Sequence, residues 1–378
     1  MQVKAMLVTH HLPEESMPWM AEVRSVFDEL VIFIDEKRVT PGTLNRAKKV
    51  GSRVHLHKAD TWFEWDLASK ARACESDWVF VIEYDEQLSP EWQQKDQWRQ
   101  ILETTAFTHF WLPRRWILPG ERRYIKCDPW WPDFQLRLLR NNLEGTRFAT
   151  RLHQTIQVPG SGACFHNLAI HHHVLWLWSR AKRVERVRYY ERLRPGGSLG
   201  YSYLYEDYRP PDAPLPKPKR LNINSELRRM EKLPPEDISK LSFKLKGVPE
   251  AVRTSDLLWL DVEITNATSQ TLSSCYPLFA VHLAYHWVYK VTGRMVIWDG
   301  CRSRLFPGVA ARKTMHSTMM IVVPDQPGEY LLQASMVQEG ISWFEKVQPD
   351  ILQEFDVLVV DRIGSLRTAA YIEFDSRT

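Results

Sequence analysis

The chain has 378 residues, a length that suits two domains with a core each. With 50 Lys and Arg against 46 Asp and Glu it carries a formal net charge of only +4, which argues against a nucleic-acid-binding protein. Five scattered cysteines without a Cys-x-x-Cys pair favour reduced thiols in a cytoplasmic protein.

The first 82 residues alternate predicted strands and helices. Short, continuous apolar runs predict buried strands, and helical apolar spacing predicts the helices between them. The expected strands cover residues 3–9, 30–35, 54–56 and 79–82, and the expected helices cover 14–30, 39–50 and 68–76. This order is typical of a doubly wound parallel sheet.

Acidic side chains follow two of these strands. Glu83 and Asp85 come directly after residues 79–82, and because they are two apart on an extended backbone they share a face. Two such carboxylates suit a divalent cation, Mg²⁺ or Mn²⁺, which can bridge to phosphate. Asp35 ends the second strand, where an acid can bind the base or ribose of a nucleotide. An acidic turn or a helix cap is the structural alternative for these acids.

The acidic stretch resembles a known family. Asp77-Trp78 and Glu83-Tyr84-Asp85-Glu86 are similar to the nucleotide-sugar-binding domain of family 2 glycosyltransferases, where an apolar strand beginning at Asp-Trp ends in Asp-x-Asp-Glu. Glu83 stands where that family usually has Asp. The resemblance implies that Asp35 and Thr9 contact the nucleotide.

The same resemblance implies a basic residue near the diphosphate, for which Lys70 and Arg72 are the candidates. A solvated helix face is equally compatible with both.

A second segment resembles the same family. Residues 109–113 predict a strand and are followed by a basic loop with Arg114, Arg115, Arg122, Arg123 and Lys126. The stretch from Pro129 to Leu138 then resembles the family's Pro-Asp-aromatic-Gln-x-Arg-Leu segment. By this resemblance Asp133 is the catalytic base, Arg137 holds an acid or a phosphate, and Trp130 and Trp131 shape the acceptor site. The structural alternative for Asp133 is an N-cap of a helix that starts at Phe134, and the two roles are compatible.

Residues 151–154 and 168–173 carry the next similarities. Arg151-Leu152-His153-Gln154 resembles the family's Val-His-Glu, with Gln154 in place of the acid. Residues 168–173 end in three histidines, and the resemblance implies that His171 or His172 joins Asp85 as a metal ligand through a neutral imidazole. A structural histidine is the alternative.

Residues 177–193 predict a helix with several basic side chains. These side chains are suited to anionic lipid head groups or a lipid-diphosphate acceptor, whereas a solvated amphipathic helix is the alternative. The sequence lacks a signal peptide and any apolar run of spanning length. We therefore expect a cytoplasmic protein, with peripheral contact at the inner face of the cell membrane left open.

A proline-dense linker separates two predicted domains. We expect the first at residues 1–208, a linker with a short helix (224–232) at 209–235, and the second at 236–378. From residue 257 the apolar period becomes two, which predicts an antiparallel β-sandwich.

Four segments of the second domain resemble another family. They are similar to the immunoglobulin-like C-terminal domain of O-antigen exporters of the ATP-binding cassette type, and they comprise residues 284–287, 299–300, 327–330 and 339–344. The resemblance implies polysaccharide binding, and a scaffolding or dimerising role is the alternative.

Together these features predict an α/β domain of the Rossmann-like glycosyltransferase-A type followed by an immunoglobulin-like sandwich. The predicted activity is inverting transfer from a nucleotide-diphosphate-sugar donor to a glycan or lipid-linked saccharide acceptor, assisted by a divalent metal. One alternative is a non-catalytic glycan-binding protein, and another is a glycoside hydrolase, which also needs two carboxylates.

Overall fold

The computed structural model describes residues 1–58, 67–127, 130–141, 143–147, 156–193, 210–229 and 231–361. The chain divides into two compact units, residues 1–230 and 231–378. The division lies inside the stretch expected to link the domains. Among the described residues, no helix is both long and apolar enough to span a membrane.

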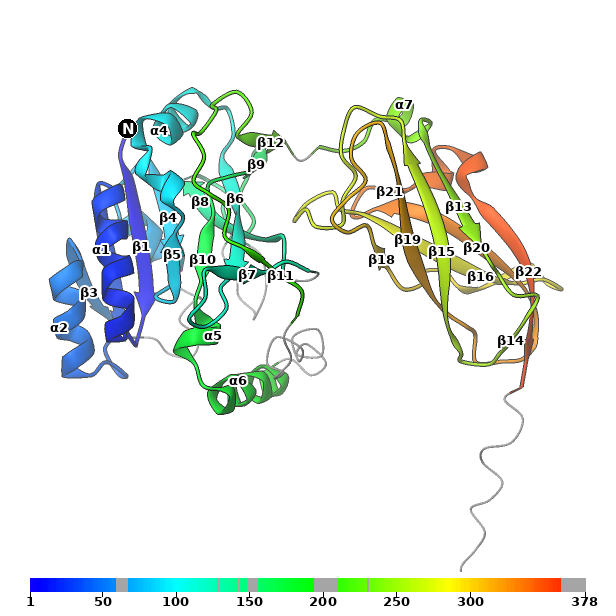
Figure 1. The fold of residues 1–378 in the computed structure, drawn as a ribbon, viewed down its shortest axis with the longest axis horizontal. Helices are drawn as coiled ribbons and strands as arrows, with labels where there is room; N and C mark the ends of the chain where they lie inside the picture. The colour runs from blue at the N-terminus through cyan, green and yellow to red at the C-terminus, as the bar shows by residue number, and fades with distance from the viewer. Residues whose placement is uncertain are drawn as a thin grey trace, which may run out of the picture. The chain divides into compact units, whose positions relative to one another are not determined.

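The first unit is built on one mixed sheet, with the path β12-β9-β6-β8-β4-β1-β2-β3 and with β10 paired to β6 and β5 (Figure 1). Its strands are β1 (Val3–Thr9), β2 (Glu29–Asp35), β3 (Arg53–His57), β4 (Trp78–Ile82), β5 (Glu86–Leu88), β6 (His109–Trp116), β8 (Asp133–Arg140), β9 (Gly162–Phe165), β10 (Ile170–His172) and β12 (Leu227–Arg229). A separate pair joins β7 (Arg123–Ile125) to β11 (Asp212–Pro214).

The parallel part of this sheet comes from the continuous apolar runs. β4, β1, β2 and β3 are parallel neighbours, and almost all apolar side chains of β4, β1 and β2 are buried on both faces of the sheet. β8 then pairs antiparallel with both β4 and β6. The parallel order predicted for the start of the chain is therefore present over four strands, and the rest of the sheet is mixed.

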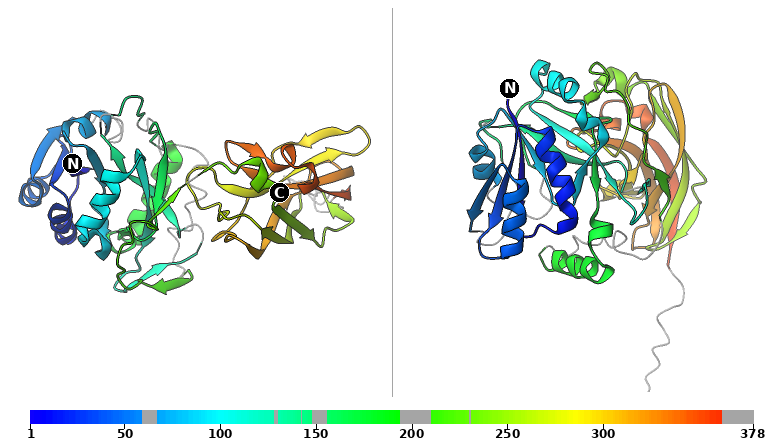
Figure 2. Two further views of the ribbon diagram at one scale, coloured as in Figure 1. Left: turned by 90° about the horizontal axis from the view of Figure 1, so that it is seen from above. Right: turned by 60° about the vertical axis from the view of Figure 1, so that its left-hand side comes forward.

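Helices cover both faces of the parallel part (Figure 2). α1 (Met17–Val26), α2 (Pro41–Val50) and α4 (Lys95–Thr104) contribute to the larger core cluster on one face. α3 (Leu67–Ala73) packs on the other face against side chains of β1, β2 and β4. α5 (Val174–Leu177) and α6 (Arg180–Leu193) follow β10. Short 3-10 turns occupy η1 (Glu14–Ser16) and η3 (Pro90–Gln93).

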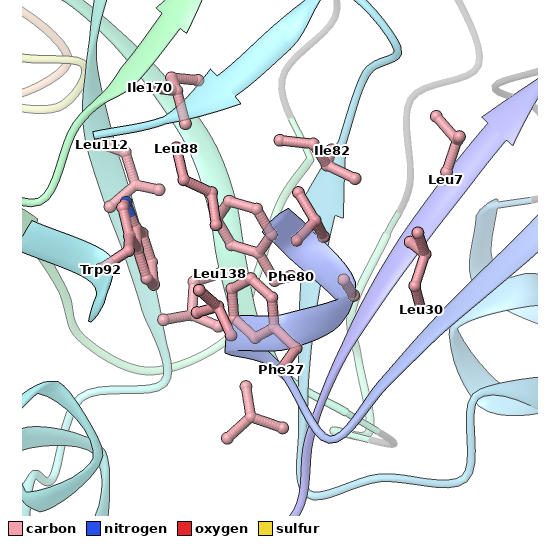
Figure 3. Close-up of a cluster of buried hydrophobic side chains, with 14 of the residues drawn as sticks. Leu7, Phe27, Leu30, Phe80, Ile82, Leu88, Trp92, Leu112, Leu138 and Ile170 are labelled. Atoms are coloured by element: carbon pink, nitrogen blue, oxygen red, sulfur yellow. The ribbon is translucent and has the colours of Figure 1, made fainter. Parts of the chain in front are cut away.

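Aromatic and aliphatic side chains fill the larger core (Figure 3). Phe80 of β4 stacks on Phe27 with ring centroids 4.7 Å apart, and Trp92 lies 5.0 Å from Phe80. Trp92 also donates from its indole to the carbonyl of Ala169, which ties the turn after β5 to the start of β10. This core fixes the ends of β4 and β10, which carry the candidate site.

One predicted helix is wrong, and so is the helix weighed as the alternative for Asp133. Residues 133–140 form strand β8, because their backbone completes the ladders between β6 and β4. Asp133 is therefore the first residue of a strand and caps no helix. The helix expected at 224–232 is absent from its described residues, where Leu227–Arg229 forms β12 on the edge strand β9. In both places a partner strand distant in sequence decides the conformation.

The second unit packs two sheets face to face. One has the order β13-β15-β19, and the other has β14-β22-β20-β16-β17 with β18 on β16 and β21 on β20. Their bounds are β13 (Leu241–Lys246), β14 (Ala251–Arg253), β15 (Leu257–Asn266), β16 (Val281–Tyr289), β17 (Arg294–Ile297), β18 (Ser303–Arg304), β19 (Lys313–Val322), β20 (Gly328–Gln338), β21 (Ser342–Trp343) and β22 (Gln353–Val360), with α7 (Pro235–Ile238), η5 (Phe344–Lys346) and η6 (Pro349–Ile351).

The period-two pattern explains this sandwich. Leu260, Val262 and Ile264 of β15 alternate into the core, and so do Leu283, Tyr285 and Trp287 of β16 on the facing sheet. All ladders are antiparallel except the parallel pair β14 and β22 among the described strands of this unit.

Candidate functional site

The carboxyl ends of β1, β2 and β4 meet at one edge of the sheet. Thr9 lies opposite Ile34, so Asp35 ends β2 one residue further on. Leu7 lies opposite Ile82, which puts the acidic turn after β4 beside the end of β1. Ligands of open α/β sheets bind outside such strand ends.

Asp85 has one carboxylate oxygen without a hydrogen-bond partner among the described residues. The residue is 5% exposed, and its Oδ2 lies 3.4 Å from His172 Nε2. Its Oδ1 is buried and unpartnered, as is Nδ1 of His172. Burying a polar atom without a hydrogen-bond partner costs about 1–3 kcal/mol of folding free energy. An unpartnered oxygen at this position therefore points to a ligand. Burial alone would raise the pKa of Asp85, but His172, Arg114 and Arg186 hold it below its ordinary value.

Glu86 is the buried centre of an ion network. Its side chain is fully buried, and Arg137 Nη2 contacts Glu86 Oε1 at 2.6 Å and Glu83 Oε1 at 2.7 Å. Arg114 Nη1 lies 3.7 Å from Glu86 Oε1. The other oxygen of Glu86 accepts from the backbone N–H of Glu83 at 3.1 Å. Burial raises the pKa of Glu86 against the pull of Arg137. At Glu83 burial acts in the same direction, but Arg137 and Arg114 together with His172 lower the pKa.

Asp133 is held by neighbouring donors. Arg114 donates from Nε at 2.8 Å and Trp116 from its indole at 2.8 Å, both to Oδ2. Gln135 donates to Oδ1 at 2.6 Å. Burial alone would raise the pKa of Asp133, but Arg114, Trp116 and Gln135 lower it, so the carboxyl is ionised. Because a carboxylate oxygen has two lone pairs, Oδ1 retains acceptor capacity.

Trp116 joins Asp133 to Asp85. Its ring meets His172 edge-to-face with centroids 4.2 Å apart, while its N–H donates to Asp133 and His172 contacts Asp85. We call Glu83, Asp85, Glu86 and Asp133, together with Arg114 and Arg137, the acidic edge. The structure therefore brings the predicted metal ligands Asp85 and His172 into one cluster with the predicted base.

α6 borders this cluster. Trp178 donates to the Tyr84 hydroxyl at 3.2 Å, and Arg186 lies over the Trp178 ring at 4.6 Å from its centroid. Burial lowers the pKa of His10, whereas His172 lowers that of Asp85, and the charge of Arg186 adds to the lowering at both groups. The basic helix and the acidic edge therefore interact electrostatically.

Asp35 and Thr9 have partners of their own. Asp35 is buried, accepts from the Arg38 side chain and accepts from the Lys37 N–H at 3.1 Å. Thr9 donates from its hydroxyl to the carbonyl of His11 at 2.5 Å. Both residues lie at the strand-end edge, yet no direct contact to Asp85 is recorded in the described part of the chain.

Lys70 and Arg72 lie on α3, which packs on the face of the sheet opposite to α1. Lys70 is buried. Arg72 is exposed and lines a cavity of about 280 Å³ with residues of α3 and of the stretch 139–146.

His171 and Trp131 meet around Arg115 instead. Arg115 Nη1 lies 3.4 Å from His171 Nε2, and its guanidinium lies over the Trp131 ring at 5.4 Å. Burial and Arg115 lower the pKa of His171 to about 3, so it is neutral at physiological pH. Trp130 is buried in one cluster with Trp116, the residue that donates to Asp133 of the acidic edge.

These contacts test how well the residues suit a divalent cation. No group of three or more His, Cys, Asp or Glu side chains that could hold a metal occurs in the described residues. Asp85 offers its unpartnered oxygen beside His172, whereas Glu83 is engaged by Arg137 and His171 by Arg115. A site with one or two protein ligands fits Mg²⁺, which usually takes the remainder from substrate phosphate and water.

Arg114, Trp116 and Glu86 are site residues that were not predicted from the sequence. The strand was expected to end at Pro113, so Arg114 was assigned to a solvated loop. The period-two alternation of side chains along the strand could have identified Arg114 and Trp116, because they continue the face of Phe110 and Leu112. The similarity at residues 151–154 and Pro129 of the second segment lie outside the described residues.

Comparisons with known proteins do not identify a family. The chain matches no protein-family model and no curated protein sequence. Over 32% of its length it is similar to a β-glucosidase from Listeria innocua, at 15% identity and a TM-score of 0.23, and covers 16% of that chain. A CARDB domain from Pyrococcus furiosus, solved with di-metal ions, has 19% identity and a TM-score of 0.21, with 32% and 87% of the two chains covered.

An alkylpurine DNA glycosylase from Pseudomonas fluorescens matches with 8% identity and a TM-score of 0.22, over 32% of this chain and 30% of that one. The chain spans only about a sixth of the length of the β-glucosidase, since 16% of it is covered. At such TM-scores these similarities carry neither a fold assignment nor a function.

Proposed function

We propose that the first unit is an inverting glycosyltransferase that uses a nucleotide-diphosphate-sugar donor and a glycan or lipid-linked saccharide acceptor. The observation that carries this proposal is the unpartnered oxygen of Asp85, buried beside His172 at the strand-end edge and joined through Trp116 to Asp133. The resemblance of both acidic segments to family 2 glycosyltransferases adds to it.

Asp85 and His172 would hold a divalent cation together with the donor diphosphate. Such a cation, when bound, neutralises charge that develops on the leaving diphosphate. Asp35 and Thr9, at the ends of the neighbouring strands, would contact the nucleoside. Arg186, which already lowers the pKa of Asp85, adds positive charge on the same side.

Asp133 would accept the proton of the acceptor hydroxyl at Oδ1, the oxygen that takes only the Gln135 hydrogen bond among the described contacts. Arg114 and Trp116 fix the carboxylate through Oδ2. The lowered pKa keeps Asp133 ionised but weakens it as a base, so proton transfer would be concerted with attack on the anomeric carbon.

Turnover of nucleotide-sugar donors tests this proposal. The full chain is incubated with uridine- and guanosine-diphosphate sugars and Mn²⁺ or Mg²⁺, and released nucleoside diphosphate is measured. We expect Asp133→Asn to lower turnover by about 10²–10⁴-fold. We expect Asp85→Asn to abolish the dependence of turnover on the added metal. Glu103→Gln, an exposed acid of α4, is the control. Equal turnover in all four proteins removes the assignment.

The second candidate function is non-catalytic glycan binding, and the second unit favours it. On β16, His286 alternates with the core residues Tyr285 and Trp287 and so points away from the core. Trp298 stacks on His286 at 4.6 Å and is 48% exposed. Glu345 contacts His286 at 3.4 Å, and Arg302, which pairs with Glu339, lies over the ring of Trp343. We call the side chains His286, Trp298, Arg302, Glu339, Trp343 and Glu345 the aromatic face.

Exposed tryptophan beside charged hydrogen-bonding groups suits the apolar face and the hydroxyls of a sugar. Saccharide binding that is lost in Trp298→Ala, in a protein without donor turnover, would favour this second function.

A further inference from the structure

α6 buries few of its described side chains against the first unit. Of the side chains described in this helix only Tyr190 is buried, while Lys182, Arg188 and Arg192 are exposed. A surface helix of a globular domain normally buries an apolar stripe. α6 has only a narrow stripe of this kind among its described residues, because Arg183, Val184, Arg186 and Val187 are half-buried and the other side chains except Tyr190 are exposed.

The charge of α6 is strongly one-sided. Its 14 residues RAKRVERVRYYERL contain six Arg and Lys against two Glu, a net +4, which equals the formal charge of the whole chain. On the helical wheel Arg188 and Arg192 follow at i and i+4 on the exposed side. Like charges at this spacing repel one another, so the helix gains when an anionic surface neutralises them.

Aromatic side chains accompany these cations. Trp176 of α5, four residues before α6, is 52% exposed, and Tyr189 of α6 is also exposed. Arg192 lies over the Tyr189 ring at 5.9 Å. Indole and phenol rings favour the interface between lipid and water because one part is apolar and the other polar.

The position of α6 links it to the site. Figures 1 and 2 show the helix at the end of the first unit toward which β1 runs. Arg186 of α6 acts electrostatically on Asp85, and Lys182 acts on His11. A surface bound by α6 would therefore lie next to the acidic edge.

We propose that α6, with Trp176 before it, docks the first unit on an anionic lipid bilayer surface. The occupant is argued from charge complementarity, from the exposed aromatic residues and from the shortage of buried side chains on the helix. Clustered Lys and Arg bind anionic lipids with a contribution that adds per residue. The inference does not depend on the proposed transferase activity, although it would bring a lipid-linked acceptor to the acidic edge.

Vesicle co-sedimentation of the full chain tests this inference. The vesicles consist of phosphatidylcholine alone or of phosphatidylcholine with phosphatidylglycerol. We expect binding only to the anionic vesicles, weakening steeply as salt is raised. The triple variant Lys182→Gln, Arg188→Gln, Arg192→Gln should bind roughly a hundredfold more weakly, and Trp176→Ser should also weaken binding.

The matched control is Arg24→Gln, Lys48→Gln, Lys49→Gln, which removes the same charge from exposed positions of α1 and α2. It should bind like the wild type. Equal loss in both triple variants, equal binding to neutral vesicles, or tighter binding of the full chain to a short single-stranded oligonucleotide than to anionic vesicles would each overturn the inference. Because the assay needs no donor or turnover, its failure is distinct from failure of the proposed function.

Discussion

The acidic edge of the first unit and the aromatic face of the second differ in how deeply their charged side chains are buried. At the acidic edge Glu86 is fully buried and shares Arg137 with Glu83. On the aromatic face Arg302 pairs with Glu339 and Asp299, whose side chains are 39% and 61% exposed. Burying charge costs free energy that exposed pairs avoid. A fold retains such a cost where the charges serve a ligand, which directs attention to the first unit.

The largest effect is expected from breaking the buried pair. Arg137→Ala leaves the buried Glu86 with the more distant Arg114 as its one cation among the described residues, and should destabilise the first unit by about 3–5 kcal/mol. Arg302→Ala, the matched change on the aromatic face, should cost at most about 1 kcal/mol because water solvates its partners. Urea unfolding followed for each unit measures both. Similar losses in the two variants would contradict the contrast.

The second prediction concerns packing beneath the acidic edge. A Cβ on Gly162 of β9 would lie 2.3 Å from both His109 Nε2 and Trp111 Cζ3, which are buried on β6. Gly162→Ala should therefore cost about 1–3 kcal/mol through overpacking. Gly42→Ala, where a Cβ meets only the Arg46 side chain at 3.5 Å, should be neutral or slightly stabilising in α2. Thermal unfolding compares the two, and an unaffected Gly162→Ala would refute the close fit.

The continuous apolar runs explain why much of the first unit was predictable. β1, β2 and β4 are buried on both faces, so their sequences leave little alternative. The stretch Asp133 to Leu138 fits an alternating strand as well as a capped helix, and only its neighbours β4 and β6 decide between them. The local sequence does not show which strands will lie beside this stretch.

The candidate site was predictable to the same degree. Asp85 and Asp133 were found from their places in the sequence, because strand ends and family-like segments identify them. The partners of Asp133 were not, since Trp116 and Arg114 reach it from β6, a strand that is distant in sequence. Which acid is paired and which oxygen is left without a partner is a property of three-dimensional packing.

The third prediction concerns how the stability of the first unit depends on pH. Burial lowers the pKa of His109 on β6 to about 4, below its unfolded value of 6.5. The unfolded chain then binds the proton more readily, so this stabilisation is complete above pH 6.5 and is lost as pH falls toward 4. Between pH 7 and 4.5, His109→Leu should lose about 2 kcal/mol less stability than the wild type in the first unit. Parallel pH profiles of the two proteins would contradict it.

The smallest effect is expected on the aromatic face. Trp298 is half exposed, and Trp298→Ala should change the unfolding free energy of the second unit by less than about 1 kcal/mol. Differential scanning calorimetry checks this value. A small stability change together with loss of saccharide binding would assign the face to recognition, whereas a large stability change would assign it to the fold.

Calorimetric titration of uridine or guanosine diphosphate in the presence of Mn²⁺ tests the central claim most directly, because it compares wild type with Asp85→Asn, which keeps the side-chain shape. If the buried oxygen of Asp85 serves a cation and a diphosphate, the wild type binds only with Mn²⁺ present, and Asp85→Asn weakens that binding by at least about tenfold. Equal affinity in the two proteins, or binding unaffected by removal of Mn²⁺, would contradict the account.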